Sequence, residues 1–228
     1  MNKRYIWGAI AAAVVVVAVL VGLSLAGGDD DDAVTGITGV AEVQQKLDGL
    51  DQAGATIGDA AAPVEIVEFG DTSCPICKEA SETTTPEILD RLVRTGQAKF
   101  TFRPVAFISN SSERGALAGE AAAKQDAMWP LIELIYANQG PESEDWLSDD
   151  LLREAVTALG LDVAQWESDY ASEAVASAFF DADAAWKAAG GTGTPTYVVT
   201  GPRGTETFDG AVGIDDIEAA VTKVGPAS

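Results

Sequence analysis

Residues 63–77 read PVEIVEFGDTSCPIC. The first seven residues of this stretch are mainly β-branched or apolar, which predicts a short strand covered on both faces. Gly70 and the three polar residues after it end the strand. A helix is expected to begin near Cys74, because Pro75 suits the first turn of a helix, where its missing N–H group costs nothing. The stretch therefore predicts a buried strand that leads directly into a helix with a Cys-Pro-Ile-Cys motif at its start.

The segments that follow predict a sheet with helices on both faces. The first helix is expected to run toward Val93, with a kink or break at Pro86, and residues 98–105 alternate as in a strand. This strand–helix–strand unit has the right length for a parallel crossover. Several helical patterns, a β-hairpin and a last helix come next: helices at about 113–139 with a break near Pro130, 145–159, 163–171 and 173–189, strands 195–199 and 206–209, and helix 214–224. This order favours an α/β layered fold, with the tryptophans of the helical region packed as core.

The composition narrows the function as well as the fold. The 228 residues carry a formal net charge of −22, contain no histidine and contain only two cysteines. The overall negative field would repel a polyanion, so no nucleic-acid partner is expected. The absence of histidine excludes Ser-His-Asp and Cys-His nucleophiles and any His-ligated metal. The length suits one domain with a short accessory segment, not a small scaffold stapled by several disulfides.

The amino terminus has the pattern of a membrane anchor. Lys3 and Arg4 precede an apolar run, residues 6–25, which as a helix would span roughly 30 Å, and four aspartates follow at 29–32. The positive-inside bias then places the amino terminus in the cytoplasm and the rest of the chain outside. The alternative is a cleaved signal peptide with a small-residue site at 24–26, although the apolar core of a signal peptide is usually shorter. Both alternatives export the domain.

The domain organisation follows from these segments. We predict an anchor or signal peptide at 1–28, an acidic linker at 29–58 and a folded domain at 59–228 with a helical insertion at about 111–190. The linker is rich in Gly, Asp, Ala and Thr and contains one weakly amphipathic patch, residues 40–50, that suits a short helix.

Two cysteines at a helix start have a specific chemistry. The backbone N–H groups and the positive end of the helix dipole lower the pKa of the Cys74 thiol from about 8.5, and a thiolate is the species that attacks disulfides. Cys77 lies one turn on and can close a small ring with Cys74, so the expected redox group is the Cys74–Cys77 disulfide itself, with no other cofactor. Half of a zinc site is an alternative, but the chain has no further Cys or His to complete it. An inert local disulfide is the other alternative.

The motifs together resemble one protein family. A strand, Cys-Pro-x-Cys at a helix start, a helical insertion and the late sequence GTPTY at 193–197 resemble the DsbA-like branch of the thioredoxin superfamily over residues 59–224. The resemblance implies a thioredoxin-like fold, with Cys74 as the exposed nucleophile and Cys77 as its buried partner. It also implies that Thr194 and Pro195 form a cis-proline loop beside the pair, where the Thr194 backbone is free to pair with an extended substrate. An ordinary proline at a strand start is the alternative for Pro195.

Glu68 is the remaining candidate site residue. It lies six residues before Cys74 in an otherwise apolar strand, and the family that the chain resembles carries a buried acid at that place. A buried carboxyl has a raised pKa and can exchange a proton with Cys77. The alternative is that Glu68 points to solvent at a strand end. Glu65, Asp71 and Lys78 are interpreted as solvated or helix-end charges.

The predicted function is an extracytoplasmic thiol:disulfide oxidoreductase, acting mainly as a disulfide-forming oxidase on reduced, unfolded exported proteins. The resemblance implies recycling by a membrane oxidoreductase of the DsbB-like or VKOR-like kind. A reductase or isomerase of the same fold, and a non-redox binding module, are the alternatives. Since Ile76 stands where strongly oxidising members of the family carry histidine, a less oxidising couple is expected here.

Overall fold

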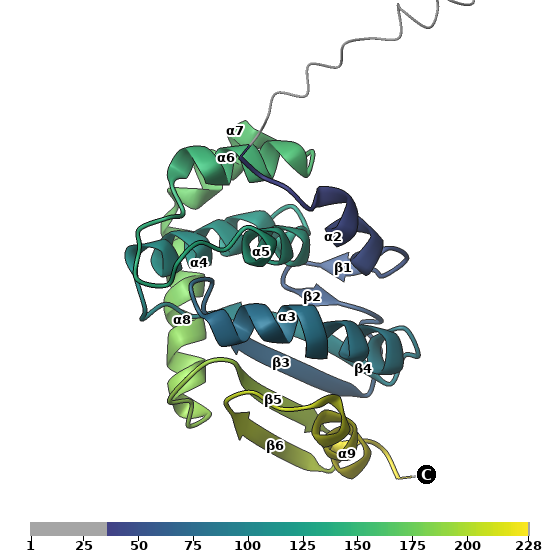
Figure 1. The fold of residues 1–228 in the computed structure, drawn as a ribbon. Helices are drawn as coiled ribbons and strands as arrows, with labels where there is room; N and C mark the ends of the chain where they lie inside the picture. The colour runs from purple at the N-terminus through teal and green to yellow at the C-terminus, as the bar shows by residue number, and fades with distance from the viewer. Residues whose placement is uncertain (1–35, 228) are drawn as a thin grey trace, which may run out of the picture. The chain divides into compact units, whose positions relative to one another are not determined.

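A six-stranded sheet organises residues 36–227, the part of the chain that the computed structural model describes (Figure 1). The strand order is β1-β2-β4-β3-β5-β6, in which β3 and β4 are parallel and the other neighbours are antiparallel. The strands are β1 (Gln52–Ala53), β2 (Thr56–Ile57), β3 (Val64–Gly70), β4 (Ala98–Pro104), β5 (Thr196–Gly201) and β6 (Gly204–Asp209). The predicted parallel crossover and the predicted hairpin are both present, and the fold is the predicted thioredoxin-like α/β type.

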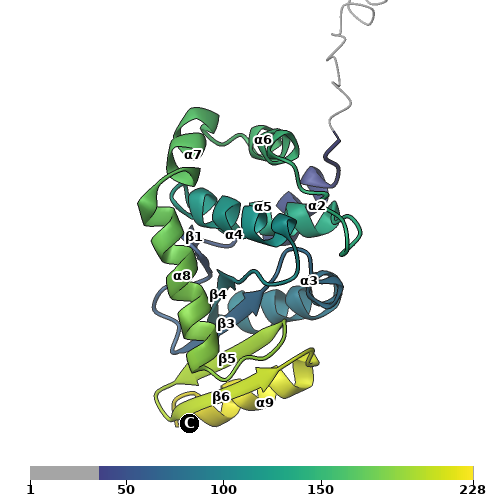
Figure 2. The ribbon, with the colours of Figure 1, turned by 90° about the vertical axis from the view of Figure 1, so that its left-hand side faces the viewer.

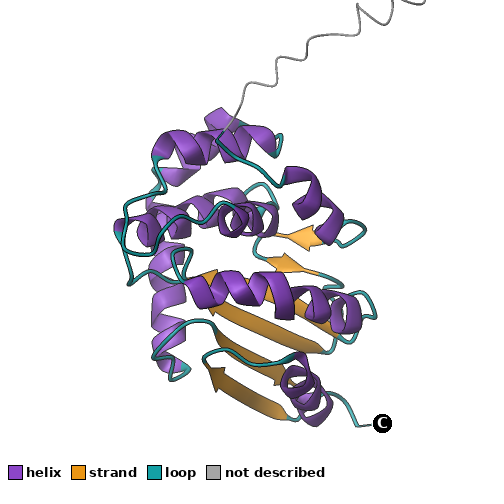
Figure 3. Cartoon of the chain, viewed as in Figure 1, coloured by secondary structure: helices purple, strands orange, loops and turns teal. Residues whose placement is uncertain are grey.

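Helices cover both faces of this sheet, as Figures 2 and 3 show. The helices are α2 (Val40–Leu47), α3 (Pro75–Ile88) with the π-helical turn η1 (Leu89–Val93), α4 (Asn110–Ala123), α5 (Met128–Ala137), α6 (Asp149–Ala158), α7 (Val163–Tyr170), α8 (Glu173–Ala188) and α9 (Ile214–Val224). The helices α3 and α9 lie against one face of the strands, and α8 lies against the other (Figures 1 and 2). The helices α4 to α8 lie within the region of the predicted insertion.

One predicted helix break differs from the structure. The break between α4 and α5 falls at residues 124–127, where Asp126 adopts a positive φ of 55°, a conformation that a short polar side chain tolerates. Pro130 instead lies in the first turn of α5, where its missing N–H group costs nothing.

The folded part begins earlier than predicted. Residues 36–58 contain α2, β1 and β2, where we expected a linker, and β2 pairs with β4 through Ile57 and Phe100. Val43 and Leu47 of α2 are buried in the core. Strands of two residues are too short to show a periodic pattern, which is why sequence alone indicated a linker.

The predictions for the amino terminus concern residues that the structure does not describe. The predicted anchor at 1–28 and the first residues of the predicted linker lie outside the described residues. Among residues 36–227, no helix has the length and apolar character needed to cross a bilayer.

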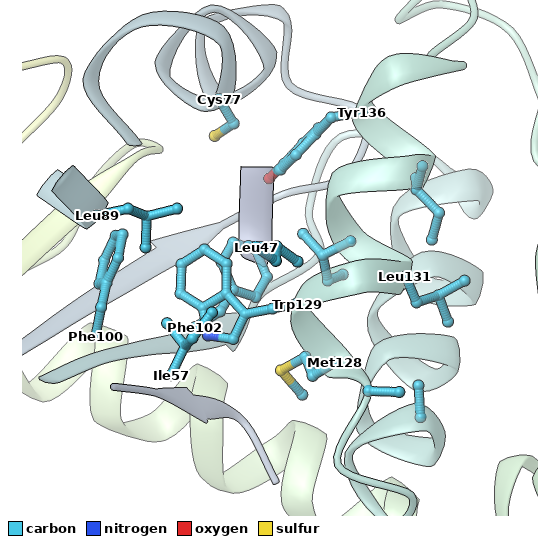
Figure 4. Close-up of a cluster of buried hydrophobic side chains, with 14 of the residues drawn as sticks. Leu47, Ile57, Cys77, Leu89, Phe100, Phe102, Met128, Trp129, Leu131 and Tyr136 are labelled. Atoms are coloured by element: carbon cyan, nitrogen blue, oxygen red, sulfur yellow. The ribbon is translucent and has the colours of Figure 1, made fainter. Parts of the chain in front are cut away.

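An aromatic core positions the site. Trp129 packs on Phe100 with ring centroids 4.6 Å apart, and Trp129, Trp166 and Trp186 are all buried as predicted. Cys77 and Tyr136 lie at one end of this cluster, with Trp129 and the phenylalanines below them (Figure 4). The cluster therefore supports the helix that carries the cysteines from beneath.

Candidate active site

Cys74 is the N-cap residue of α3, as the sequence predicted. Its backbone is extended, and its Sγ accepts a hydrogen bond from the amide of Cys77 at 3.3 Å. The hydrogen bond with the Cys77 thiol, joined by backbone N–H groups of Cys77 and Ile76, lowers the pKa of Cys74 to about 6, although burial opposes the shift. The first proton lost from the pair is therefore that of Cys74.

Cys77 is the less accessible and less acidic sulfur. It is fully buried, and burial raises the pKa of its thiol well above the ordinary value, with the charge of Cys74 adding to the shift. Both cysteines are free thiols in this structure. The exposure of Cys74 is lower than the resemblance implied, because only 5% of the residue is accessible beside the loop that contains Thr194. Cys74 is still the sulfur that a partner thiol or disulfide would reach first.

The predicted proline loop lies directly beside Cys74. The Thr194–Pro195 peptide bond is cis, and the Sγ of Cys74 lies 3.4 Å from the carbonyl oxygen of Thr194. Pro195 immediately precedes β5. It is therefore both the proline of a cis loop and a proline at the start of a strand, the two alternatives that the sequence offered.

Asp209 at the end of β6 braces this loop. Its carboxylate accepts hydrogen bonds from the amides of Thr192 and Gly193 and from the hydroxyl of Thr196. Hydrogen bonds from the Thr192 hydroxyl and amide, with those from Gly193 and Thr196, lower the pKa of Asp209 to about 2. Sequence reasoning missed Asp209, because its partners lie on a separate loop.

Glu68 points into the protein, so the solvent-facing alternative is wrong. It is 2% exposed and lies in register between Tyr197 of β5 and Phe102 of β4. Burial, and then the negative charge of Glu133, raise the pKa of Glu68 to about 8. A carboxyl group that stays protonated near neutral pH is thus placed in the core beneath the two cysteines.

Two polar side chains hold the segment that precedes Cys74. The amide group of Gln139 donates to the carbonyl oxygens of Thr72, at 2.7 Å, and of Cys74, at 3.1 Å. Asp71 accepts from the amides of Ser73, at 2.8 Å, and Phe107, at 3.0 Å. The sequence suggests a solvated or helix-end charge for Asp71, and the structure excludes the solvated alternative: Asp71 is fully buried just before α3, where its oxygens cap these loop amides. No motif or pattern in the sequence indicated Gln139 as a site residue.

No part of residues 36–227 brings together three or more His, Cys, Asp or Glu side chains in an arrangement that could hold a metal ion. The chemistry that the described geometry offers is thiol–disulfide exchange.

Comparison with known proteins agrees with this geometry. A family model described as "Thioredoxin" matches residues 51–223, well over half of the chain. The chain belongs to this thioredoxin family. It is 34% identical to the probable disulfide bond formation protein D of Bacillus cereus over 159 residues, which cover 68% of this chain and 73% of that protein.

Solved structures of DsbA-like proteins resemble this thioredoxin-family chain. BdbD from Bacillus subtilis, in its oxidised form, superimposes with a TM-score of 0.66 and 25% identity, covering 76% of this chain and 96% of that one. The thiol-disulfide exchange protein α-DsbA2 from Wolbachia pipientis has the same fold, with a TM-score of 0.62, 19% identity, and coverage of 86% of this chain and 98% of that one. The chain is thus a DsbA-like member of the family and a thiol:disulfide oxidoreductase.

Proposed function

We propose that this protein is an extracytoplasmic oxidase that introduces disulfides into reduced, unfolded exported proteins. The observation that carries the proposal is the difference between the two sulfurs, one stabilised as a thiolate with a pKa of about 6 and the other buried and protonated. Stabilising the thiolate favours the reduced form of the pair, and a stable reduced form makes the disulfide a better oxidant.

The reaction balances two electrons and two protons. In the oxidised protein, a substrate thiolate attacks the Sγ of Cys74, the Cys74–Cys77 bond breaks, and a mixed disulfide forms. The two substrate thiols release their protons to solvent as they ionise. Cys77 leaves as a thiolate and takes a proton from the carboxyl group of Glu68, which regains a proton from solvent. The second substrate thiolate then attacks the substrate sulfur of the mixed disulfide. Cys74 leaves as a stable thiolate, and the substrate has lost two electrons.

The surface around Cys74 supports an unfolded polypeptide as the substrate. The lining of an open pocket of about 550 Å³ combines the apolar Phe107 and Phe180 with charged side chains, Glu113, Asp183 and Lys187. Ser109 also lines it, and its hydroxyl lies 2.9 Å from that of Ser73, next to Cys74. Phe107 and Phe180 are exposed large apolar side chains, as is Ile76 between the cysteines. An unfolded chain exposes apolar side chains that such a surface can cover.

The backbone of Thr194 would align the substrate with the disulfide. We propose that an extended substrate segment pairs with it, in the manner of an added strand. Pro195 would hold that backbone beside Cys74, where the structure places it.

Turnover requires reoxidation of the Cys74–Cys77 dithiol. We propose that a membrane oxidoreductase, of the DsbB-like or VKOR-like kind, accepts the two electrons. The amino-terminal apolar run would keep the domain at the outer face of the membrane near that partner. Disulfides persist in such surroundings.

The test is an oxidation assay with a reduced, unfolded protein that contains two cysteines. The oxidised protein should accelerate disulfide formation in this substrate and should transfer one disulfide per protein molecule. Cys74→Ser should abolish the acceleration. In cells, Cys77→Ala should accumulate mixed disulfides, formed when the Cys74 thiolate attacks a disulfide of a substrate or of the recycling partner, because the variant lacks the second thiol that resolves the adduct. Full activity of Cys74→Ser would refute the redox function, and trapped adducts from native cells would identify the substrates and the recycling partner.

A further inference from the structure

A second carboxyl group is buried near Glu68. Glu133 of α5 is 3% exposed and accepts a hydrogen bond from the hydroxyl of Ser81 at 2.8 Å. The ammonium group of Lys46 contacts the same carboxylate and also donates to the carbonyl oxygen of Ser81 at 3.0 Å. Ser81 lies one helical turn after Cys77 on α3. Three helices, α2, α3 and α5, therefore meet at one ion pair beside the helix that carries the cysteines.

The groups that face Glu68 are almost all acids. They are Cys74 at the N-cap of α3, Cys77 within α3, Glu133 and Tyr136 from α5, and Tyr197 from β5, with Asp71 close to Tyr136. Lys46 of α2 supplies a positive charge to this cluster, and its side chain is 23% exposed, so it also reaches solvent. The carboxylate that Lys46 touches is that of Glu133, so Lys46 offsets part of the negative charge of this pair of buried acids.

We propose that the Glu133–Lys46 pair is a positioning device that sets the pH at which Glu68 releases its proton. Through Glu68, α2 and α5 would then control how readily Cys77 is protonated when it leaves the disulfide. The inference rests on the proposed role of Glu68 in the exchange reaction.

Electrostatics gives the direction of this control. Burial raises the pKa of Glu133 above the ordinary value of a glutamate, and the contacts with Lys46 and Ser81 oppose that shift and favour the carboxylate. Burial, and then the negative charge of Glu133, raise the pKa of Glu68, so Glu68 keeps its proton at neutral pH. The two carboxyl groups titrate as a pair, and the second proton leaves only at higher pH.

The experiment measures how fast glutathione reduces the oxidised full-length protein between pH 5.5 and 9.5. Rates are corrected for the fraction of glutathione present as thiolate. The corrected rate should be constant at low pH and should fall once Glu68 loses the proton that Cys77 needs. The midpoint should lie near or somewhat below pH 8, because the pKa of about 8 holds for the reduced protein and the disulfide lacks the charge of Cys74.

Two variants should move this midpoint in opposite directions. Glu133→Gln removes a negative charge and should lower the midpoint by about one pH unit or more, without changing the low-pH rate. Lys46→Gln removes a positive charge, which makes loss of the second proton harder, and should raise the midpoint. Lys46→Arg keeps the charge and should leave it in place. Glu120→Gln is the matched control, because Glu120 is a mostly buried acid of α4 whose neighbouring charges are Arg103 and Lys124.

The variant Glu68→Gln, used as a background, shows whether Glu133 and Lys46 act through the proton of Glu68 or only support the fold. It should abolish the fall in rate with pH, and adding Glu133→Gln or Lys46→Gln should then cause no further change in pH dependence. An unmoved midpoint in both Glu133→Gln and Lys46→Gln, a shift in the same direction for both, or a shift that survives in the Glu68→Gln background would overturn the proposal. Failure of the oxidase function would appear separately, as an oxidised protein that reacts with glutathione but forms no disulfides in unfolded proteins.

Discussion

At the residue scale, the ionisation of Cys74 can be measured directly. The hydrogen bonds around its Sγ predict that the absorbance of the thiolate at 240 nm rises with a midpoint near pH 6 in the reduced protein. Cys77 should contribute no second rise near neutral pH, since burial and the charge of Cys74 raise its pKa. The Cys74→Ser variant is the control and should lose the transition. A midpoint of about 8.5, as in free cysteine, would contradict the prediction.

The same property sets the expected redox potential. The pKa of about 6 lies between about 7 for thioredoxin and about 3.5 for DsbA. The potential should accordingly lie between their values of about −270 mV and about −120 mV. This agrees with the expectation from Ile76, whose side chain cannot supply a positive charge to the thiolate. A potential as high as about −120 mV, measured by equilibration with glutathione, would show that another contact stabilises the reduced form.

The site residues that sequence could predict are those within one local motif. Cys74 and Cys77 were predicted because two cysteines with this spacing at a helix start have a specific chemistry. The Thr194–Pro195 dipeptide was predicted from the resemblance to the DsbA-like family. Glu133 comes from a different helix, yet a signal existed, because α5 reads MWPLIELIYA and an acid in so apolar a helix needs a buried partner. Lys46 had no such signal, since α2 carries several other polar residues.

At the element scale, α4 packs unusually close to the active-site loop at Gly115. A Cβ atom added there would lie 2.8 Å from the Cβ of Thr72, which is buried and whose carbonyl is held by Gln139. Gly115→Ala should therefore destabilise the protein by about 1–2 kcal/mol, because overpacking outweighs the gain in helix propensity. Thermal unfolding followed by circular dichroism measures this change.

Gly119 on the same helix provides the matched control. A Cβ atom there would lie 3.0 Å from Cδ1 of Ile132, the far end of a flexible side chain that can move. Gly119→Ala should be neutral or slightly stabilising, because alanine is the better helix former. Equal losses in both variants would mean that α4 tolerates no added volume anywhere and that contact with the active-site loop is not special.

Helices and strands were predictable where the hydrophobic pattern was long or where glycine and proline marked their ends. The hairpin turn between β5 and β6 and the bounds of α9 agree with the prediction, since glycine and proline mark the turn and an amphipathic pattern marks the helix. The break between α4 and α5 was misplaced, because proline in the first turn of a helix looks the same in sequence as proline that ends one.

At the scale of the whole molecule, the net charge of −22 should make stability depend on salt. Self-repulsion destabilises the compact state, and the Debye length falls from about 30 Å at 0.01 M salt to about 10 Å at 0.1 M. Salt also weakens attractive pairs such as Arg153–Glu167, but exposed pairs each contribute only about 0–1 kcal/mol. Repulsion among the excess carboxylates should therefore dominate.

The melting temperature of the reduced protein at pH 7 should rise by about 2–4 °C between 0.01 M and 0.3 M sodium chloride, which corresponds to about 1 kcal/mol for a chain of this size. The control is the same titration near pH 4, where many carboxyl groups are protonated and the salt effect should shrink. A matched series in sucrose separates screening from general solute exclusion, because sucrose carries no charge. A melting temperature that falls with salt at pH 7 would mean that ion pairs, not repulsion, dominate the electrostatics of the fold.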